Sequence, residues 1–453
     1  MTVTIPPIKL YPPQLEFFKS KTRYTAYGGA RGGGKSYAAR TKAVLMALNY
    51  SGIQILFLRR TYSQVNENHI KPMMSVFNEL IKNKVMKYKD TDKVFKFING
   101  SNIKFGYCDN EKDVLQYQGQ SYDVIFMEEA TQFTEFQFQC LTECNRSSGL
   151  IKGKKFKSRM YFTCNPGGVG HEWVKRLFVD RTYKNNEKEE DYTFIRSSVY
   201  DNKFLMDNDP DYVRTLENLP EKRKKAMLYG DWDVLEGQYF EEFSRDIHVV
   251  EPFEIPKHWR RYIAFDYGLD MFACYFIALD ERGKAYVYKE IYQSGLIISQ
   301  AAQEILNAKA GEEIYQIFAP PDMWNKRQET GRSIAEIFRD NGLLLTKANN
   351  DRIQGWLDLK EWLKPYEDEQ GIKTANIVFF KNCQNLIRCL PLLQYDSKNP
   401  NDTAREPHEI THAPDAIRYF VAGRPRKTIV EQTNKSTLWM FNNQKQEGDF
   451  LQW

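Results

Sequence analysis

The segment that most constrains the fold of this chain is a glycine-rich stretch near its start. Residues 29–36 read GARGGGKS and fit G-x-x-x-x-G-K-[ST], the pattern of a loop that binds nucleotide phosphates. A strand-like run over residues 23–27 precedes the stretch, and a helix-like run over residues 36–46 follows it. Backbone N–H groups of such a loop surround phosphates at the positive end of the helix dipole. The segment therefore predicts a nucleoside triphosphatase.

Separate roles are expected within this loop. Lys35 is expected to reach the β- and γ-phosphates of ATP, and Ser36 to bind Mg²⁺. Arg31 is a candidate to neutralise transition-state charge from within the same chain. The loop residues predicted to contact the nucleotide are Gly29, Ala30, Arg31, Gly32, Gly33, Gly34, Lys35 and Ser36.

Length and composition narrow the class of protein. A chain of 453 residues is too long for one core and suggests two or three domains. The net charge of +5 is too mild to indicate nucleic-acid binding by itself. Seven cysteines without a C-x-x-C pair indicate neither a zinc ribbon nor a disulfide framework. With no signal-like start and no apolar run near 18 residues, we expect a cytosolic protein without membrane contact.

The pattern of predicted elements divides the chain into parts. Strand-like and helix-like segments alternate up to about residue 235, which predicts an α/β domain with a parallel central sheet. A hairpin with an Asn-Gly turn is expected over residues 94–105. After a proline-containing connector, three closely spaced strands over residues 262–288 predict an antiparallel meander. The predicted boundaries are 1–235 for the first domain, 236–257 for a linker, 258–425 for the second domain and 426–453 for a flexible tail.

Two acids follow a buried strand about 90 residues after the loop. Residues 124–127 are apolar, and Glu128 and Glu129 come directly after them. This is the pattern of a Walker B element, in which the first acid holds Mg²⁺ and the second polarises the attacking water. The usual first acid is aspartate, so Glu128 departs from the pattern by one methylene.

Further candidates belong to the same predicted site. Thr163 and Asn165 follow the next strand, where a polar side chain can sense the γ-phosphate. Gln14 precedes the first strand and is a candidate to read adenine through its amide. Arg146, after the acids, is a candidate to act on a neighbouring subunit. Arg59 and Arg60, at a strand end, are weaker candidates than Arg31.

Three aspartates in the second half suggest a second chemistry. Asp266 ends the first meander strand, Asp322 follows a later strand, and Asp415 opens a helix near the end. Cleavage of phosphodiesters by two metal ions needs several carboxylates that converge from separate elements. The strand order and the three acids together predict an RNase H-like nuclease domain that binds Mg²⁺ or Mn²⁺, although each acid alone is more readily explained as a turn or cap residue.

In this combination the chain resembles the large terminase subunit of tailed bacteriophages over about residues 8–425. The resemblance rests on Gln14, the loop with Arg31, Glu128-Glu129, residues 163–166, residues 230–232 and the aspartates at 266, 322 and 415. It implies a P-loop ATPase domain of the ASCE type followed by an RNase H-like nuclease domain with a mixed sheet. Glu129 would be the catalytic glutamate, and Arg146 corresponds loosely to an arginine finger that acts in trans.

The resemblance also implies a function and partners. Such a chain would use ATP to drive double-stranded DNA through a portal protein into a procapsid, and would cut the concatemer. It would work with a small terminase subunit, as a monomer in solution that forms a homo-oligomeric ring on the portal. We would expect it in the host cytoplasm and transiently at the procapsid portal, and not in the mature virion.

Two other functions stay open at this stage. A DNA repair or recombination ATPase–nuclease would carry helicase motifs in a second ATPase-like domain, and we find none. A nucleotide-gated scaffold would bind DNA or protein without cleaving it. Two basic clusters are candidate phosphate contacts, of the kind that bind DNA without regard to sequence. Their members are Lys152, Lys154, Lys155, Lys157 and Arg159 in one, and Lys222, Arg223, Lys224 and Lys225 in the other.

Overall fold

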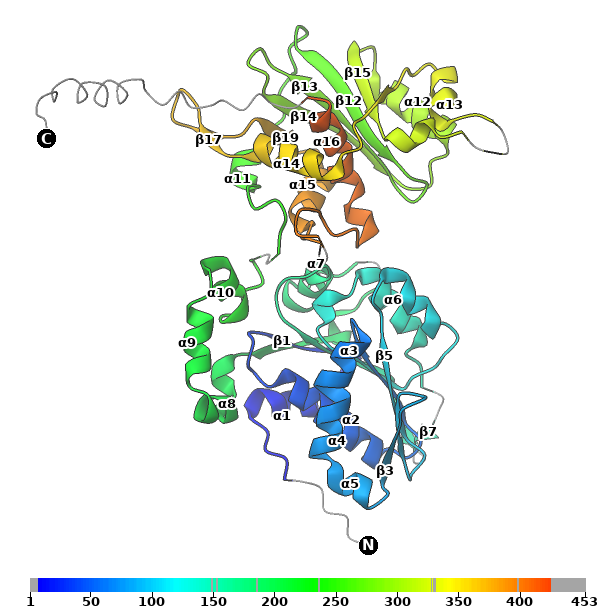
Figure 1. The fold of residues 1–453 in the computed structure, drawn as a ribbon, viewed down its shortest axis with the longest axis vertical. Helices are drawn as coiled ribbons and strands as arrows, with labels where there is room; N and C mark the ends of the chain where they lie inside the picture. Colours follow the sequence, from blue (N-terminus) through cyan, green and yellow to red (C-terminus); the bar gives the residue numbers. More distant parts are fainter. Residues whose placement is uncertain are drawn as a thin grey trace, which may run out of the picture.

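Most of the described strands assemble into two large sheets, which lie in the two lobes of Figure 1. The structure is a computed structural model. It describes residues 7–424 except 148–149, 152–153, 185, 235–236, 327, 329–330 and 397–398, and it does not describe the side chains of residues 150, 151, 154 and 155. Within the described residues, no helix is both long and apolar enough to span a membrane.

The first sheet has eight strands in the order β10-β1-β9-β6-β2-β5-β4-β3. The strands from β10 to β5 run parallel. Strand β4 then pairs antiparallel with β5, and β3 pairs antiparallel with β4. Every residue of β1 and β6 is buried, as expected for parallel strands that are covered on both faces. The bounds are β1 (Tyr24–Gly29), β2 (Gln54–Arg59), β3 (Met86–Lys89), β4 (Val94–Phe97), β5 (Asn102–Tyr107), β6 (Val124–Met127), β9 (Arg159–Cys164) and β10 (Tyr192–Ser197).

Helices cover both faces of the first sheet. One apolar cluster joins the sheet to α1 through α5, and a second joins it to α6 and α7. Helices α8 to α10 have a small core of their own and stand beside the sheet (Figure 1). The bounds are α1 (Pro12–Lys19), α2 (Lys35–Asn49), α3 (Tyr62–Val65), α4 (Lys71–Val76), α5 (Asn78–Lys82), α6 (Glu135–Cys144), α7 (His171–Val174), α8 (Lys203–Asn208), α9 (Asp211–Glu217) and α10 (Glu221–Met227).

Short irregular elements complete this domain. Two turns are π-helical, η1 (Asn66–Ile70) and η4 (Lys175–Val179). The 3₁₀ turns are η2 (Glu111–Tyr117), η3 (Ala130–Gln132), η5 (Glu189–Asp191) and η6 (Val199–Asp201), and a two-residue pair is formed by β7 (Leu150–Ile151) and β8 (Lys154–Lys155).

The second sheet is mixed, with seven strands in the order β11-β19-β14-β13-β12-β15-β16. Strands β12, β13 and β14 form the predicted antiparallel meander, and β15 then pairs parallel to β12. The bounds are β11 (Val249–Val250), β12 (Arg260–Tyr267), β13 (Phe272–Leu279), β14 (Ala285–Gln293), β15 (Ile314–Ala319), β16 (Thr346–Lys347) and β19 (Ile377–Phe380), with a separate pair β17 (Tyr366–Glu367) and β18 (Lys373–Thr374).

The helices of this domain also lie on two faces. A cluster with α14, α15 and α16 covers one face, and a cluster with α12 and α13 covers the other. Figure 1 shows α12 and α13 on the opposite side of the sheet from α14 and α15. The bounds are α11 (Arg245–His248), α12 (Ile298–Lys309), α13 (Ile334–Asp340), α14 (Arg352–Leu363), α15 (Gln384–Cys389) and α16 (His412–Ala422), with 3₁₀ turns η7 (Pro321–Trp324), η8 (Leu390–Leu392) and η9 (His408–Ile410).

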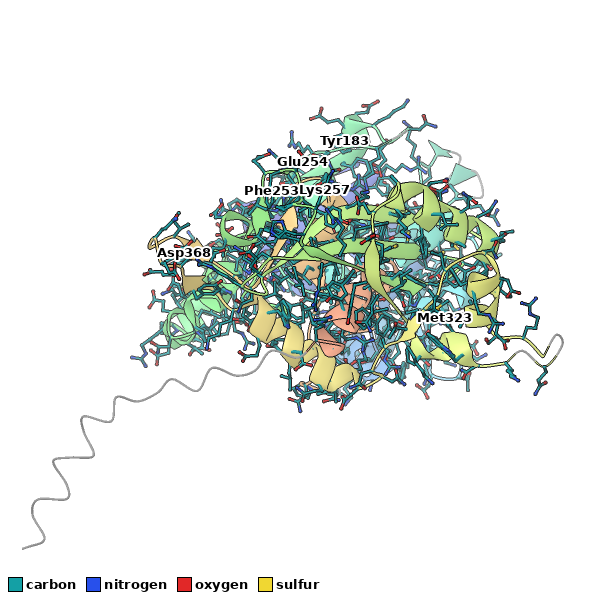
Figure 2. All side chains as sticks on the ribbon, turned by 90° about the horizontal axis from the view of Figure 1, so that it is seen from above. Tyr183, Phe253, Glu254, Lys257, Met323 and Asp368 are labelled. Carbon is teal, nitrogen blue, oxygen red and sulfur yellow. The ribbon has the colours of Figure 1, made fainter. Side chains whose placement is uncertain are left out.

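These sheets confirm the predicted fold class, the hairpin and the meander. The domain boundaries themselves stay predictions. Part of the predicted linker, residues 236–257, is not a linker, because β11 pairs with β19 and Tyr239 and Phe240 lie in the core of the second domain. Figure 2 shows Phe253 and Lys257, which follow β11, on a different side of the molecule from Met323. The predicted tail, residues 426–453, lies outside the described residues.

The two domains touch through an ion pair. Arg60, just after β2, donates to Glu406 Oε2 at 3.0 Å and also to the carbonyl of Gln132 at 3.3 Å. The other oxygen of Glu406 accepts the backbone N–H of Glu111 at 2.9 Å. This contact lies two residues before His408, at the start of the segment that leads into α16.

Candidate nucleotide and metal sites

The glycine-rich loop has the backbone that its sequence predicts. β1 ends at Gly29, α2 begins at Lys35, and Gly34 takes a left-handed φ of 74° between them. A Cβ at Gly34 would lie 2.4 Å from Gln14 Nε2, so a side chain at this position would also force Gln14 to shift. Only glycine meets both demands without strain.

Lys35 links three of the predicted residues. It is 6% exposed, and its Nζ donates to the Ala30 carbonyl at 2.5 Å and to Asn165 Oδ1 at 2.7 Å. Asn165 Nδ2 in turn donates to Glu129 Oε2 at 2.9 Å. Burial lowers the pKa of Lys35, and the charge of Glu129 opposes that shift. The structure thus brings the loop lysine, the amide of Asn165 and the second acid into one hydrogen-bonded chain. We call residues 163–165 the coupling segment, because the terminase resemblance implies that they couple hydrolysis to motion.

Glu129 has a strained backbone. Its φ is 52°, in the left-handed region that residues with a side chain seldom occupy. Its backbone N–H donates to Thr163 Oγ1 at 3.1 Å, so the end of β9 holds the turn that follows β6. Strain of this kind costs on the order of 1–3 kcal/mol and persists where the surrounding structure holds it, often at functional sites.

Glu128 lies on the other side of the loop. It is 1% exposed, and Ser36 Oγ donates to its Oε2 at 3.0 Å. Burial raises the pKa of Glu128, and the charge of Glu129 raises it further. Its Oε1 is buried without a hydrogen-bond partner among the described residues. A serine hydroxyl and a carboxylate oxygen free to coordinate are the ligands that Mg²⁺ prefers, so Ser36 and Glu128 fit the predicted ion.

A cavity of about 490 Å³ opens over the loop. Arg31, Lys35, Ser36, Glu129 and Asn165 line it, as predicted for a nucleotide site. Asn202, Leu205 and Tyr212, from the segment at α8 and α9, line its other side and were missed from the sequence. No local motif marks these three residues, because they come from a helical segment with its own small core.

Two other predicted residues, Gln14 and Arg146, do not line this cavity. The Gln14 amide is engaged within the protein, since Oε1 accepts from the Tyr11 N–H at 3.0 Å and Nε2 lies 3.4 Å from the Gly34 carbonyl. In this arrangement Gln14 supports the loop, and reading adenine would require it to exchange these bonds. Arg146 is exposed near Tyr122, before the start of β6 and at the opposite end of this strand from Glu128. Its predicted role remains one that acts on a neighbouring subunit.

The three predicted aspartates come from separate elements of the second domain. Asp266 lies in β12, Asp322 in η7 and Asp415 in the first turn of α16. Burial raises the pKa of Tyr419, and the charges of Asp266, Asp415 and Asp322 raise it further. The charges of all three carboxylates therefore reach the phenol of Tyr419; whether the carboxylates share a metal ion stays a prediction.

Three residues missed from the sequence extend this region. The ligand atoms of Asp270, His408 and His412 all lie within 4.8 Å of one another. His412 Nδ1 lies 2.7 Å from Asp266 Oδ2, and its Nε2 lies 3.1 Å from Asp270 Oδ2. Imidazole and carboxylate groups are ligands for divalent transition metals, so the cluster fits an ion such as Mn²⁺. The spacing of His408 and His412 by four residues was the available sequence signal.

The pKa shifts of these groups agree with the pairing of His412 with Asp266 and Asp270. Burial opposes protonation of His412, but the hydrogen bond and charge of Asp266, with the charge of Asp270, raise its pKa. Burial works against ionisation of Asp270, yet His412 and His408 lower its pKa. Burial raises the pKa of Asp266 more than the bond from His412 lowers it.

Asp415 is held by two arginines. Arg352 Nη1 donates to its two oxygens at 3.1 and 3.2 Å, and Arg418 Nε donates to Oδ1 at 2.8 Å. A metal ion at Asp415 would have to share the carboxylate with both guanidinium groups. The metal role of Asp415 stays a prediction, and its observed role is to anchor α16 to α14.

The basic clusters are only partly described. Lys157 is exposed, and Arg159 stacks over the Phe156 ring with 4.9 Å to the centroid. Lys152 lies outside the described residues, as do the side chains of Lys154 and Lys155. On α10, Lys222 and Lys224 pair with Glu241 and Glu221. Whether either cluster contacts DNA remains a prediction.

Comparison with known proteins gives one family. The family model described as phage terminase large subunit matches residues 21–230. A search of curated proteins finds no match. Among solved structures, the large terminase of a thermophilic bacteriophage is 18% identical, with 92% of this chain and 99% of that chain covered and a TM-score of 0.41.

Two further structures are similar at lower identity. The large terminase of bacteriophage HK97 is 10% identical, with 92% and 95% covered and a TM-score of 0.48. The large terminase nuclease of thermophilic phage G20c is 15% identical, with 37% of this chain and 87% of that chain covered and a TM-score of 0.28.

Fold and sites together define a class of protein: a P-loop ATPase domain with a parallel sheet, followed by an RNase H-like domain with a mixed sheet. The family match over residues 21–230 falls on the first of these domains. Over residues 21–230 the chain matches the family of phage large terminase subunits.

Proposed function

We propose that this chain hydrolyses ATP to move double-stranded DNA into a procapsid, and that its second domain cuts the DNA with the help of metal ions. The observation that carries the proposal is the hydrogen-bonded chain from Lys35 through Asn165 to Glu129. It couples the group expected at the phosphates to the group expected at the attacking water. The match of residues 21–230 to the phage terminase large subunit family supports the context of DNA packaging.

The residues of the first site suggest how hydrolysis proceeds. A bound Mg²⁺ would neutralise charge on the β- and γ-phosphate oxygens. Lys35 would leave the Ala30 carbonyl and Asn165 to contact the phosphates, and Ser36 and Glu128 would hold the ion. A Glu129 carboxylate oxygen would accept a proton from the attacking water. Arg31, in the cavity wall, would offset the charge of the transition state.

The same contacts suggest how hydrolysis is sensed. Asn165 bonds Lys35 through its oxygen and Glu129 through its nitrogen. When Lys35 moves to the phosphates, one of these bonds is lost, and the amide can reorient Glu129. This supports the predicted coupling role of residues 163–165.

The second site would cut the DNA backbone. Metal ions would activate the attacking water and stabilise the leaving oxygen. Asp266, Asp270, His408 and His412 would hold them, with Asp322 as a further carboxylate at the edge. Because Asp270 and His408 are exposed, a phosphodiester can approach from solvent.

The partners follow from the proposed role. A packaging motor would act with a small terminase subunit and a portal protein, as a homo-oligomeric ring on the portal. We place it in the host cytoplasm and transiently at the procapsid portal, and not in the mature virion.

Two substitutions test the proposal by separating its activities. Lys35→Ala should lower ATP hydrolysis by about 10²–10³-fold, as loss of one charge-stabilising donor does elsewhere, and leave Mn²⁺-dependent plasmid cleavage intact. Asp266→Ala should abolish cleavage and leave ATP hydrolysis intact. Lys21→Ala and Asp246→Ala, at exposed positions away from both sites, are the matched controls.

The outcomes also separate the alternatives. Cleavage that survives Asp266→Ala would show that the metal site is wrong. Lack of plasmid cleavage by the unmodified chain under Mn²⁺ would favour a nucleotide-gated scaffold. ATP-dependent separation of DNA strands would favour a repair or recombination enzyme.

A further inference from the structure

A histidine that plays no part in the proposed chemistry lies directly behind the first acid. His69 is fully buried, and its Nε2 lies 3.4 Å from Glu128 Oε2. Its ring packs on Phe57 of β2, with 4.7 Å between the ring centroids. Neither ring nitrogen has a hydrogen-bond partner within normal geometry among the described residues. The carboxylate of Glu128 lies within reach of this Nε2.

The backbone that carries His69 is unusual. The residue lies on the π-helical turn η1, between α3 and α4. Such single turns widen a helix by one residue and occur often at functional sites. Arg40, which lines the nucleotide cavity, donates to the carbonyl of Asn68 at 2.7 Å and so ties this turn to α2. The turn is thus fixed from the nucleotide side.

The imidazole of His69 is suited to act as a donor. A neutral imidazole carries one N–H and needs one acceptor. A buried N–H without an acceptor costs about 1–3 kcal/mol, so the ring gains by closing the gap to Glu128.

The length of the Glu128 side chain matches the position of His69. Glu128 Oε2 lies between Ser36 on α2 and His69 on η1, while its backbone N–H is fixed to the Leu58 carbonyl at 3.0 Å. An aspartate from the same backbone would end about 1.5 Å short, the length of one carbon–carbon bond. It would lose contact with Ser36, His69 or both. The extra methylene of Glu128 and the histidine on the turn therefore belong together.

We propose that His69 is a positioning residue for the ATPase site: its Nε2–H holds Glu128 Oε2 and leaves Oε1 to face the magnesium ion. The inference rests on the proposed function, because it assigns a partner to the same ion. It explains why this chain has glutamate where the Walker B pattern usually has aspartate. His69 itself does not line the nucleotide cavity.

Nucleotide affinity with and without metal tests the inference. We would titrate the full chain with a fluorescent ADP analogue across Mg²⁺ concentrations and in EDTA. His69→Phe keeps the aromatic volume and removes the donor. It should raise the Mg²⁺ concentration for half-maximal binding by about 10–100-fold, as loss of a ligand's supporting partner does elsewhere, and leave the affinity in EDTA unchanged. His69→Gln, which restores a donor, should recover most of the Mg²⁺ response.

A second variant keeps the test decisive if His69→Phe does not fold. Glu128→Asp should also raise the Mg²⁺ requirement, although aspartate is the commoner residue at this position. In the Glu128→Asp background, replacement of His69 should have little further effect. An unchanged Mg²⁺ response in Glu128→Asp, or in a folded His69→Phe, would overturn the inference.

This result is distinguishable from failure of the proposed function. If the unmodified chain binds nucleotide with a Mg²⁺ response that His69 controls, yet does not hydrolyse ATP, the positioning role stands and the ATPase proposal fails. If ATP is hydrolysed and Lys35→Ala abolishes it, but the Mg²⁺ response ignores His69, the positioning role alone fails.

Discussion

The two candidate sites of this chain are built in different ways. In the nucleotide site, Lys35, Glu128 and Asn165 are buried, and their hydrogen bonds connect the ends of neighbouring parallel strands. In the second domain, the ligands come from a strand, a loop and a helix, and Asp270 and His408 are exposed. The first site is closed by its own bonds, whereas the second presents its ligand atoms to solvent.

The difference suggests how each site should respond to damage. In the nucleotide site the side chains are joined in series by single hydrogen bonds, so loss of one side chain displaces its neighbour. In a cluster with several overlapping ligands, loss of one leaves the others in reach of a metal ion. We therefore expect large effects in the first site and, apart from loss of Asp266, graded effects in the second.

The largest effect is expected from Glu129→Gln. The amide keeps an oxygen for Asn165 but cannot take up a proton from water, so turnover of ATP should fall by about 10²–10⁴-fold. Affinity for a fluorescent ADP analogue should stay within a few-fold of the unmodified chain. Steady-state hydrolysis and equilibrium binding measure the two quantities.

Glu135→Gln is the matched control for that change, because Glu135 pairs with Arg176 on the same domain and lies outside the nucleotide cavity. If Glu129→Gln retains more than a tenth of the turnover, another group accepts the proton. ATP hydrolysis would then not depend on every residue of the hydrogen-bonded nucleotide site.

A smaller effect is expected from His412→Ala. This change removes a ring that contacts both Asp266 and Asp270, and it should raise the Mn²⁺ concentration for half-maximal DNA cleavage by about 10–100-fold. His258→Ala, at an exposed histidine paired with Glu281, is the control. Loss of all cleavage at saturating Mn²⁺ would show that this site is as sensitive as the first to the loss of one side chain. An unchanged Mn²⁺ requirement would show that the ion binds elsewhere.

Much of the first site could be predicted from the sequence, because its parts are local. The loop, the two acids and the segment at 163–165 each follow a strand that its apolar run marks. Parallel strands bring their carboxyl ends to one edge, so the three motifs must meet. What the sequence does not mark is support from outside the motifs, such as Asn202 and the π-helical turn at His69.

The second site could be predicted only in part. Asp266 and Asp322 follow recognisable strands, but His412 meets Asp266 across 146 residues of sequence. No local pattern encodes such a contact, and a histidine at a helix start has many structural uses. For the same reason the pairing of Asp415 with Arg352 was not foreseen, although Arg418 lies one turn away. The linker prediction was wrong for a different reason, since Tyr239 and Phe240 lie in a core whose other members come from later elements, α14 among them.

The smallest effect is a loss of stability at low pH. It concerns the segment behind the nucleotide site. His171 is buried behind the coupling segment, where its Nδ1 accepts the Gly167 N–H at 2.8 Å and its Nε2 lies 3.0 Å from the Trp232 carbonyl. Burial lowers its pKa from 6.5 to about 4, although the bond to Trp232 opposes the shift. The folded state therefore favours the neutral ring. Its stabilising contribution is complete above pH 6.5 and is lost as the pH falls towards 4.

Between pH 7 and pH 5 this group alone should remove about 2 kcal/mol of the free energy of unfolding. Urea unfolding at the two pH values measures the loss, and in His171→Gln the loss should be smaller by that amount. His258→Gln, at an exposed histidine, controls for removal of a titrating ring. Equal acid sensitivity in His171→Gln and the unmodified chain would mean that the ring is protonated without cost. The segment behind the nucleotide site would then be as open to solvent as the metal cluster, and the contrast between the two sites would be weaker than their burial suggests.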